Sequence, residues 1–331
     1  MNRKRQQRSL VTANVCNASL RPTRGLQGKG RSMAQYLVLD IGGTFVKYAI
    51  MDGDGAFIKQ GKVPANTSSE AHMLESLEEV HAVVGDDYEG VAISMPGRID
   101  TKRGWAYTGG AFTWLHDYPA AERYGAVFGK PTTVANDGKC AAIAESWSGA
   151  LSDVDSGAVL VLGTGVGGGI VLNGKVWMGC SGGAGELSWL VCDYPAIHEG
   201  HAGSAIWAGK IAAGAIVPKF GLAKGLANAD GIMLFDAYEA GDPDAVQVMD
   251  EYAMWASSGI VCLQAVLDLP RYAIGGGISA RPEATSLIRD AVDKLYEIHP
   301  YLPFSKPEIV TCKYGNEANL IGALAFHLDQ V

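Results

Sequence analysis

Two glycine–threonine turns at matching places in the chain restrict its fold more than any other feature. The first consists of Gly42, Gly43 and Thr44, and the second of Gly163, Thr164 and Gly165. Each turn joins two apolar runs of strand length, and the second run leads into a further turn, at 52–55 or 173–174, that is typical of a β-hairpin. Each half therefore begins with a three-stranded antiparallel meander, and the repeat indicates a duplicated α/β architecture.

Strand and helix patterns alternate after each meander. A capping box at Thr67 and Glu70 predicts the start of the first helix. Further strands are expected at 90–94, 131–135, 158–162, 271–274 and 307–312, and helices at 284–298 and 316–328. The predicted domains are a basic tail at 1–32, a smaller α/β domain at 33–147 together with 316–331, and a larger α/β domain at 148–315. A ligand is expected in the cleft between the two domains.

The charge of the chain is unevenly spread. Residues 1–32 hold eight basic and no acidic side chains, which leaves 19 basic against 35 acidic side chains elsewhere, a net charge of −16. A body this acidic is a poor candidate for nucleic-acid binding, which selects a basic face. The tail is interpreted as a non-functional extension, and organellar targeting or a contact with nucleic acid or another partner stay open as alternatives.

Cysteine spacing and hydropathy exclude further classes. The six cysteines are scattered and form no C-x-x-C pair, which argues against a disulfide scaffold or a zinc ribbon and favours a reducing compartment. The longest uncharged runs have 15 residues, whereas a membrane-spanning helix needs about 18 to 20 apolar residues. No membrane partner is therefore expected.

The glycine turns themselves indicate a phosphate site. Consecutive N–H groups in such a turn form a nest for anions, so two turns facing each other across a cleft fit a triphosphate. The spacing of Gly163, Gly165 and Gly168 also matches a dinucleotide-binding pattern, but that pattern requires a following helix, and residues 170–174 have the pattern of a strand and hairpin. The P-loop pattern does not occur in the sequence.

Five motifs in order resemble those of one family. Residues 40–44, 162–170 and 274–278 are similar to the two phosphate motifs and the adenosine motif of the actin–hexokinase–Hsp70 ATPases. The pair at 136–137 and the loop at 182–186 narrow the resemblance to the ROK sugar kinases (repressor, open reading frame, kinase), over residues 36–328. The sequence looks closest to the zinc-free branch that includes bacterial β-glucoside kinases.

The resemblance implies both a fold and an activity. The implied fold is a duplicated actin-like, ribonuclease H-like ATPase fold of two domains. The implied activity is ATP-dependent phosphorylation of a hydroxyl, expected to be O6, of a hexose or β-glucoside such as glucose or cellobiose. ATP and Mg²⁺ are the implied cofactors, a small sugar and ATP are the implied partners, and a homodimer in the cytoplasm is the implied state.

Asp137 is the candidate general base. It follows a predicted strand and opens a helix, whose N-terminus favours an ionised carboxylate that can accept the proton of an attacking hydroxyl. An N-cap aspartate without chemistry is the competing interpretation. The family resemblance implies that Asn136 and Glu186 bind sugar hydroxyls. It also implies that Gly97 contacts the sugar through its backbone, in competition with a plain Pro-Gly turn.

The remaining candidates are expected around ATP and its metal ion. By resemblance, Asp40 at the end of the first strand orients Mg²⁺ through water, since oxygen ligands and retained waters suit that ion. An Asx-type turn is the alternative. Lys47 is expected either near the phosphates or simply on a strand face. Gly275 and Gly276 are expected to let adenine and ribose pack against the backbone.

The sequence departs from the family pattern where the sugar is expected. Trp189 stands where many members have a histidine, and Gly110 lies near the place of a sugar-contacting asparagine. The aromatic face of Trp189 and the extra room at Gly110 favour a sugar that carries a bulky group on its anomeric side. Plain glucose stays open as the alternative substrate. Cys192, His198 and His201 fall short of the four paired ligands of structural zinc, so no zinc site is expected.

Two other functions stay open at this point. A sugar-responsive regulator of the same family would carry a helix-turn-helix domain, and the 39 residues before Asp40 show no paired amphipathic helices. A non-catalytic or different actin-fold ATPase would not need the Asn136-Asp137 pair or Glu186.

Overall fold

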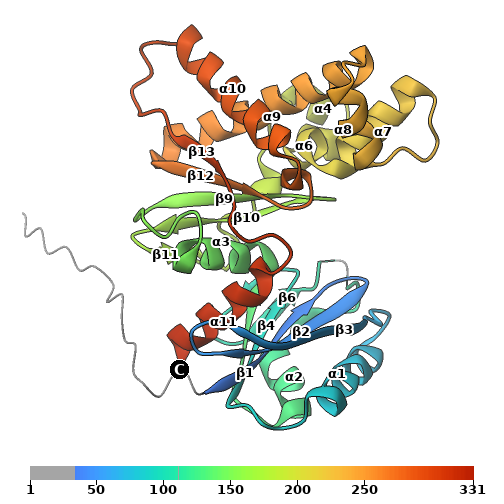
Figure 1. The fold of residues 1–331 in the computed structure, drawn as a ribbon, viewed down its shortest axis with the longest axis vertical. Coiled ribbons are helices and arrows are strands. Elements are labelled where there is room, and N and C mark those ends of the chain that lie inside the picture. Colours follow the sequence, from blue (N-terminus) through green and yellow to red (C-terminus); the bar gives the residue numbers. More distant parts are fainter. Residues whose placement is uncertain (1–33, 111) are drawn as a thin grey trace, which may run out of the picture.

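The computed structural model describes residues 34–110 and 112–331, so the predicted basic tail at 1–32 lies outside the described residues. Two five-stranded sheets form the two halves of the molecule, one above the other in Figure 1. The strand orders are β3-β2-β1-β4-β8 and β11-β10-β9-β12-β13. In each sheet a three-stranded antiparallel meander is extended by two parallel strands, which confirms the expected duplication.

The strands at the centre of each sheet are the most buried. The first sheet holds β1 (Gln35–Ile41), β2 (Phe45–Asp52), β3 (Phe57–Pro64), β4 (Gly90–Met95) and β8 (Thr132–Asn136), and the second holds β9 (Gly157–Leu162), β10 (Val166–Leu172), β11 (Lys175–Val176), β12 (Arg271–Gly275) and β13 (Glu308–Thr311). Every residue of β4 is buried, as expected of a parallel strand covered on both faces. The parallel register aligns Asp40 with Ser94, and Met95 with Asn136, at one edge of the sheet.

Two helices lie between the sheets and join the halves. α3 (Asp137–Ser148) packs against β10, and α11 (Ala318–Gln330) packs against β4 and β1; the two helices also pack against each other. Their contact is so close that a β-carbon at Gly322 would lie 1.8 Å from the carbonyl oxygen of Cys140. Since α3 contacts elements of both halves, the predicted domain boundary at residue 147 stays a prediction.

Two helices cover the other face of the first sheet, α1 (Glu70–Val84) and α2 (Ala120–Phe128). The capping box predicted at Thr67 is wrong, because the N-cap of α1 is Ser69, whose Oγ accepts the backbone N–H of His72 at 3.3 Å. Glu70 is not a capping partner either. Its Oε1 accepts hydrogen bonds from the Tyr118 hydroxyl and from Nε of Arg123, both at 2.8 Å.

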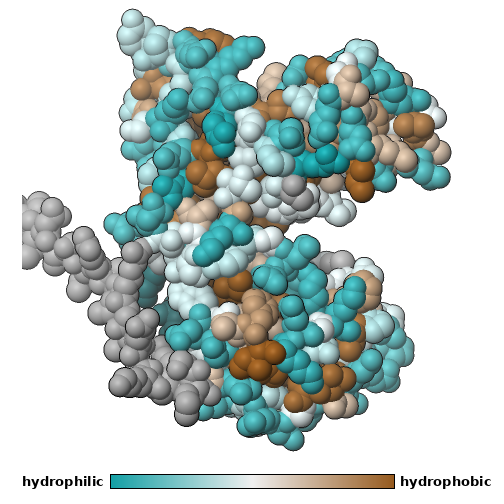
Figure 2. Space-filling view, in the orientation of Figure 1, coloured by the Kyte–Doolittle hydropathy of each residue, from teal (hydrophilic) through white to brown (hydrophobic). Residues whose placement is uncertain are grey.

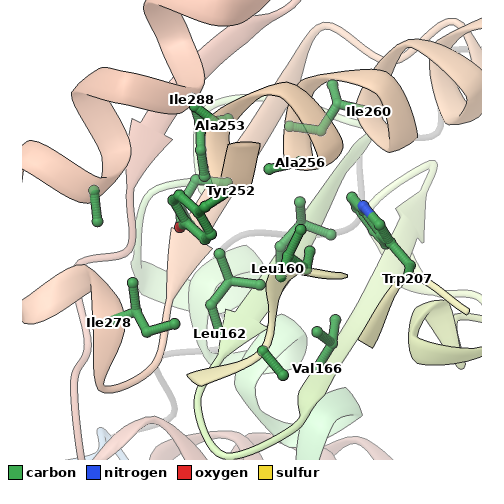
Figure 3. Close-up of a cluster of buried hydrophobic side chains, with 14 of the residues drawn as sticks. Leu160, Leu162, Val166, Trp207, Tyr252, Ala253, Ala256, Ile260, Ile278 and Ile288 are labelled. Atoms are coloured by element: carbon green, nitrogen blue, oxygen red, sulfur yellow. The ribbon is translucent and has the colours of Figure 1, made fainter. Parts of the chain in front are cut away.

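A helical layer covers the second sheet. It contains α4 (Tyr194–His198), α5 (Ala202–Ala205), α6 (Ala208–Ile211), α7 (Ala213–Lys224), α8 (Gly231–Glu239), α9 (Pro243–Leu267) and α10 (Pro282–Ile298). Figure 3 shows Tyr252 of α9 and Trp207 over Leu160 and Leu162 of the sheet. The indole Nε1 of Trp207 donates to the carbonyl of Trp255 at 2.9 Å, so this large buried side chain has its one donor satisfied.

A small third sheet, which the sequence patterns did not indicate, lies at 99–118. It consists of β5 (Ile99–Asp100), β6 (Trp105–Thr108) and β7 (His116–Tyr118). Two short 3-10 helices, Leu187–Trp189 and Ile278–Ala280, complete the elements. Figure 2 shows the surface hollowed between the two halves. None of the helices in residues 34–110 and 112–331 has the length and apolar character needed to cross a membrane.

Candidate active site

Asp137 is the first residue of α3 and directly follows β8. Its Oδ1 accepts hydrogen bonds from the backbone N–H of Gly138 at 2.8 Å and from Nδ2 of Asn136 at 2.9 Å. Asn136 is the N-cap of the helix, because its Oδ1 accepts the backbone N–H of Lys139 at 3.1 Å. The interpretation of Asp137 as the N-cap is therefore wrong, and capping does not explain a carboxylate at this position.

The surroundings of Asp137 alter its proton affinity. Burial is the main cause that raises the pKa of Asp137 to about 6. The hydrogen bond from Gly138 lowers the pKa, the negative charges of Asp40 and Glu186 raise it, and the positive charge of Lys139 lowers it. A carboxylate whose pKa lies near the operating pH is well matched to general-base chemistry.

Asn136 connects two loops of the site. Besides its bond to Asp137, its Nδ2 donates to the carbonyl of Gly97 at 3.0 Å. Both amide hydrogens are thus used within the protein, and the side chain holds the turn after β4 against the start of α3. The predicted contact between Asn136 and a sugar hydroxyl stays a prediction, while its role in positioning Asp137 is visible in the geometry.

Glu186 lies across from the start of α3, at the end of the glycine loop. Its Oε1 accepts a hydrogen bond from Nζ of Lys139 at 3.0 Å, and its side chain is 41% exposed. Trp189 follows within the same turn, with its backbone N–H donating to the carbonyl of Glu186 at 3.2 Å. Trp189 is 70% exposed, so its side chain is accessible to a ligand. A partly exposed carboxylate and an exposed tryptophan thus stand three residues apart on one loop.

Asp40 is fixed by side chains from three other elements. Its Oδ1 accepts from Oγ of Ser94 at 3.1 Å and from Nδ2 of Asn319 at 3.0 Å. Its Oδ2 lies 3.3 Å from Nζ of Lys47, which is aligned with it on β2. These contacts come from β2, β4 and α11 rather than from its own turn. A single carboxylate held by outer partners fits Mg²⁺, which keeps most of its waters.

The two glycine turns are closed in similar ways. The N–H of Gly42 donates to the carbonyl of Phe45 at 3.0 Å, and the N–H of Gly163 donates to the carbonyl of Gly165 at 2.9 Å. The second turn also contacts the start of α7, whose Ala213 N–H donates to the carbonyl of Gly163 at 2.8 Å. Each turn thus has a defined backbone shape.

Open space beside these turns is where phosphates are expected. A β-carbon at Gly43, Gly163 or Gly165 would have no other protein atom within 4 Å. Thr44 and Thr164 are exposed. Packing therefore does not require glycine at these positions, and backbone N–H groups with free space beside them, such as those of Gly43 and Gly165, suit an anion.

Glycines 275 and 276 are required by the protein itself. A β-carbon at Gly276, whose φ is +87°, would lie 2.3 Å from the carbonyl oxygen of Leu162. A β-carbon at Gly275 would lie 2.9 Å from Sγ of Cys312. Packing alone accounts for both glycines, so their contact with adenine and ribose stays a prediction.

The sugar-side glycines pack the loops after β4 and β6 together. Gly97 has a φ of +105°, and a β-carbon there would lie 1.9 Å from the carbonyl oxygen of Thr108. Gly110 has a φ of +60°, and a β-carbon at this position would lie 3.0 Å from Cβ of Pro96. The structure thus brings Gly97, Gly110 and Asn136 together, and sugar contacts of both glycines stay predictions.

No zinc site was expected around Cys192, His198 and His201. Sγ of Cys192 donates to the carbonyl of Ala205 at 3.5 Å. Across 34–110 and 112–331, no group of three or more His, Cys, Asp or Glu side chains is arranged to hold a metal ion.

Three residues of the site were not found from the sequence. Ser94 and Asn319 hold Asp40, and Lys139 holds Glu186. Ser94 and Asn319 have no local signal, because their partner is distant in the chain. Lys139 does have one: a lysine in the first turn of a helix opposes the helix dipole.

The two sheets share one order of strands, and each has a glycine turn on its first hairpin, which is the architecture of the actin-like ATPase fold. Comparison with known proteins gives the particular family. The ROK family matches residues 36–330, and the chain belongs to this family.

Individual relatives cover nearly the whole described chain. A β-glucoside kinase of Klebsiella pneumoniae is 29% identical over 299 residues, which are 88% of this chain and 95% of that protein. A glucokinase of Halalkalibacterium halodurans is 28% identical over 315 residues, 87% of this chain and 93% of that protein. A ROK family protein of Streptococcus pneumoniae TIGR4, solved in complex with sucrose, has a TM-score of 0.80 and 25% identity, with 89% of this chain and 98% of that chain covered.

Proposed function

We propose that this carbohydrate kinase transfers the γ-phosphate of ATP to a hydroxyl, O6, of a hexose or β-glucoside. The observation that carries the proposal is the state of Asp137, a carboxylate at a strand end whose pKa burial raises to about 6. Its Oδ1 is held by Gly138 and Asn136, and the charges of Asp40 and Glu186 act on it. The kinase names of similar proteins support the same reaction.

In this proposal Asp137 accepts the proton of the attacking sugar hydroxyl. Glu186 accepts hydrogen bonds from the neighbouring hydroxyls of the sugar. Asn136 fixes the position of Asp137 relative to the Gly97 turn through its two hydrogen bonds. Most of the acceleration in phosphoryl transfer comes from such positioning and from charge stabilisation, since the protein performs little covalent chemistry.

The ATP side of the proposal uses the two glycine turns. When bound, Mg²⁺ and ATP supply a transferable phosphoryl group whose negative charge is partly neutralised. The N–H groups of Gly43 and Thr44 in the first turn, and of Thr164 and Gly165 in the second, would hold phosphate oxygens. Asp40 would hold the ion through water, and Lys47 stands beside it, with Nζ 3.3 Å from the carboxylate.

The proposed substrate has a bulky anomeric side, as in a β-glucoside or cellobiose. Trp189 offers an open aromatic face in the turn after Glu186, which suits stacking of a second ring. Gly110 adds no side chain to the loop beside Gly97. The β-glucoside kinase of Klebsiella pneumoniae and the sucrose complex of the similar ROK protein support a substrate with a group at the anomeric carbon.

A coupled assay of ADP release over a panel of sugars tests this proposal. The panel holds glucose, fructose, mannose, N-acetyl sugars, cellobiose and aryl β-glucosides, each with ATP and Mg²⁺. We expect kcat/KM for cellobiose or an aryl β-glucoside to equal or exceed that for glucose. Efficient turnover of glucose alone would contradict the proposed substrate class, and no turnover of any sugar would contradict the kinase itself.

We also propose that the protein forms a homodimer in the cytoplasm, because it resembles the other members of the family. The described cysteines, Cys140, Cys180, Cys192, Cys262 and Cys312, are all free, which fits a reducing compartment. Light scattering of the purified protein measures its mass in solution. A mass equal to one 34.8 kDa chain would contradict the dimer.

A further inference from the structure

Lys139 is a buried cation in the first turn of α3. Its side chain is 1% exposed, and its Nζ donates to Oε1 of Glu186 at 3.0 Å. Its backbone N–H donates to Oδ1 of the N-cap Asn136, so the residue is fixed at both its backbone and its side chain. Glu186, in contrast, is 41% exposed. The pair therefore links the buried start of the helix to an accessible carboxylate.

Local physical chemistry disfavours a lysine at this position. A cation in the first helical turn opposes the helix dipole, and removing an ammonium group from water is costly even when it is paired. An apolar side chain of similar length would avoid both costs. Residues that break local rules in this way are expected mainly at functional sites.

The backbone segments that carry the two side chains are packed closely together. Gly169 of β10 lies against α3: its β-carbon would be 2.7 Å from Cβ of Ala142 and 3.6 Å from Cα of Lys139. On the other side, a β-carbon at Gly185, next to Glu186, would be 3.3 Å from Cα of Gly169. Helix, strand and loop are thus in backbone contact, so Nζ reaches Glu186 from a rigid frame.

We propose that Lys139 is a positioning residue, which holds Oε1 of Glu186 so that Oε2 accepts a hydrogen bond from a sugar hydroxyl. This inference rests on the proposed sugar-binding role of Glu186. Among the described residues Oε2 makes no hydrogen bond, so it is available to a ligand. A carboxylate held on one side loses less side-chain freedom when the sugar binds, because most of its ordering has already occurred in the free protein.

A double-mutant cycle tests the inference through sugar binding in the absence of ATP. Calorimetry gives the dissociation constants of glucose and cellobiose for the wild type, Lys139→Met, Glu186→Gln and the double variant. We expect Lys139→Met to weaken binding about tenfold in the wild type and less than about twofold when Glu186→Gln is present. If Lys139→Met does not fold, Lys139→Gln, which keeps a donor without the charge, replaces it in the cycle.

The control is Lys224→Met, which removes another partly buried ion pair, with Asp242 at 2.7 Å, at the N-terminus of α9. We expect it to leave both dissociation constants unchanged, and the KM for ATP to be unchanged in Lys139→Met. Independent, multiplying effects of the two substitutions, or unaltered sugar binding in Lys139→Met, would overturn the inference. A wild type that binds sugar through this pair but transfers no phosphate would instead overturn only the proposed function.

Discussion

Asp137 is the proposed acceptor of the sugar proton. Replacing one of its carboxylate oxygens by an amide nitrogen removes this role and keeps its hydrogen bonds in the fold. Asp137→Asn keeps an Oδ1 that accepts the bonds from Gly138 and Asn136, but the new amide accepts no proton. We predict a loss in kcat of about 10² to 10⁴-fold, the usual contribution of a general base, with an unchanged unfolding midpoint. Steady-state kinetics and circular dichroism check both results, and near-wild-type turnover would contradict the assignment.

The pH dependence of turnover is a second prediction for the same residue. Burial raises the pKa of Asp137 to about 6, so the carboxylate is protonated and inactive as a base below this value and ionised above it. We predict that kcat/KM for the sugar falls as the pH is lowered through about 6. A profile that stays flat down to the ordinary aspartate range near pH 4 would show that another group accepts the proton.

At the scale of elements, Glu145 of α3 binds both of the chain segments that connect the two halves. Its buried carboxylate accepts the backbone N–H groups of Ala150, at 2.6 Å, Lys313, at 3.0 Å, and Tyr314, at 2.8 Å. Ala150 belongs to the passage from α3 to β9, and the other two belong to the passage from β13 to α11. One side chain thus satisfies three donors in two connections.

Glu145→Ala leaves those three donors without their partner. We predict a loss of about 3 kcal/mol in the free energy of unfolding, because each of the three lost hydrogen bonds contributes about 1 kcal/mol. Thermal unfolding measures the effect. Glu79→Ala on the exposed face of α1 is the matched control, with an expected change within about 0.5 kcal/mol. Equal midpoints for the two variants would contradict the structural role of Glu145.

The glycine positions give a paired prediction. A β-carbon at Gly168, whose φ is +152°, would lie 2.1 Å from the carbonyl oxygen of Val159, whereas one at Gly43 would meet no protein atom within 4 Å. Gly168→Ala is therefore expected to destabilise the fold. Gly43→Ala is expected to keep the unfolding midpoint and raise the KM for ATP. A Gly43→Ala variant with unaltered ATP kinetics would contradict a phosphate contact at this turn.

The sequence was sufficient to predict the repeated meanders, because their turn residues and apolar runs are local signals. It was insufficient for contacts between distant segments. Asn319 contacts Asp40 and Glu145 contacts Tyr314 only after the two helices pack between the sheets. The misplaced start of α1 has a local cause: several hydroxyl side chains precede the helix, and Ser69 is the one that caps it.

At the scale of the whole molecule, the proposed site needs residues from both halves. Asp137 and Asp40 belong to strand ends of the first half, while Glu186 and the 163–165 turn belong to the second. The hollow between the halves, seen in Figure 2, is where sugar and ATP are proposed to meet. A site divided in this way should transfer phosphate only when both ligands are present, since each half contributes part of it.

The dependence of ATP turnover on sugar is the sharpest test of a site divided between the two halves. ADP release is followed with ATP and Mg²⁺ alone and again with the best sugar of the panel, together with the yield of sugar phosphate. We predict that sugar increases ADP release about 100-fold or more, with one sugar phosphate formed for each ADP. ADP release at the same rate with and without every sugar would contradict it and identify an ATPase that is not a sugar kinase.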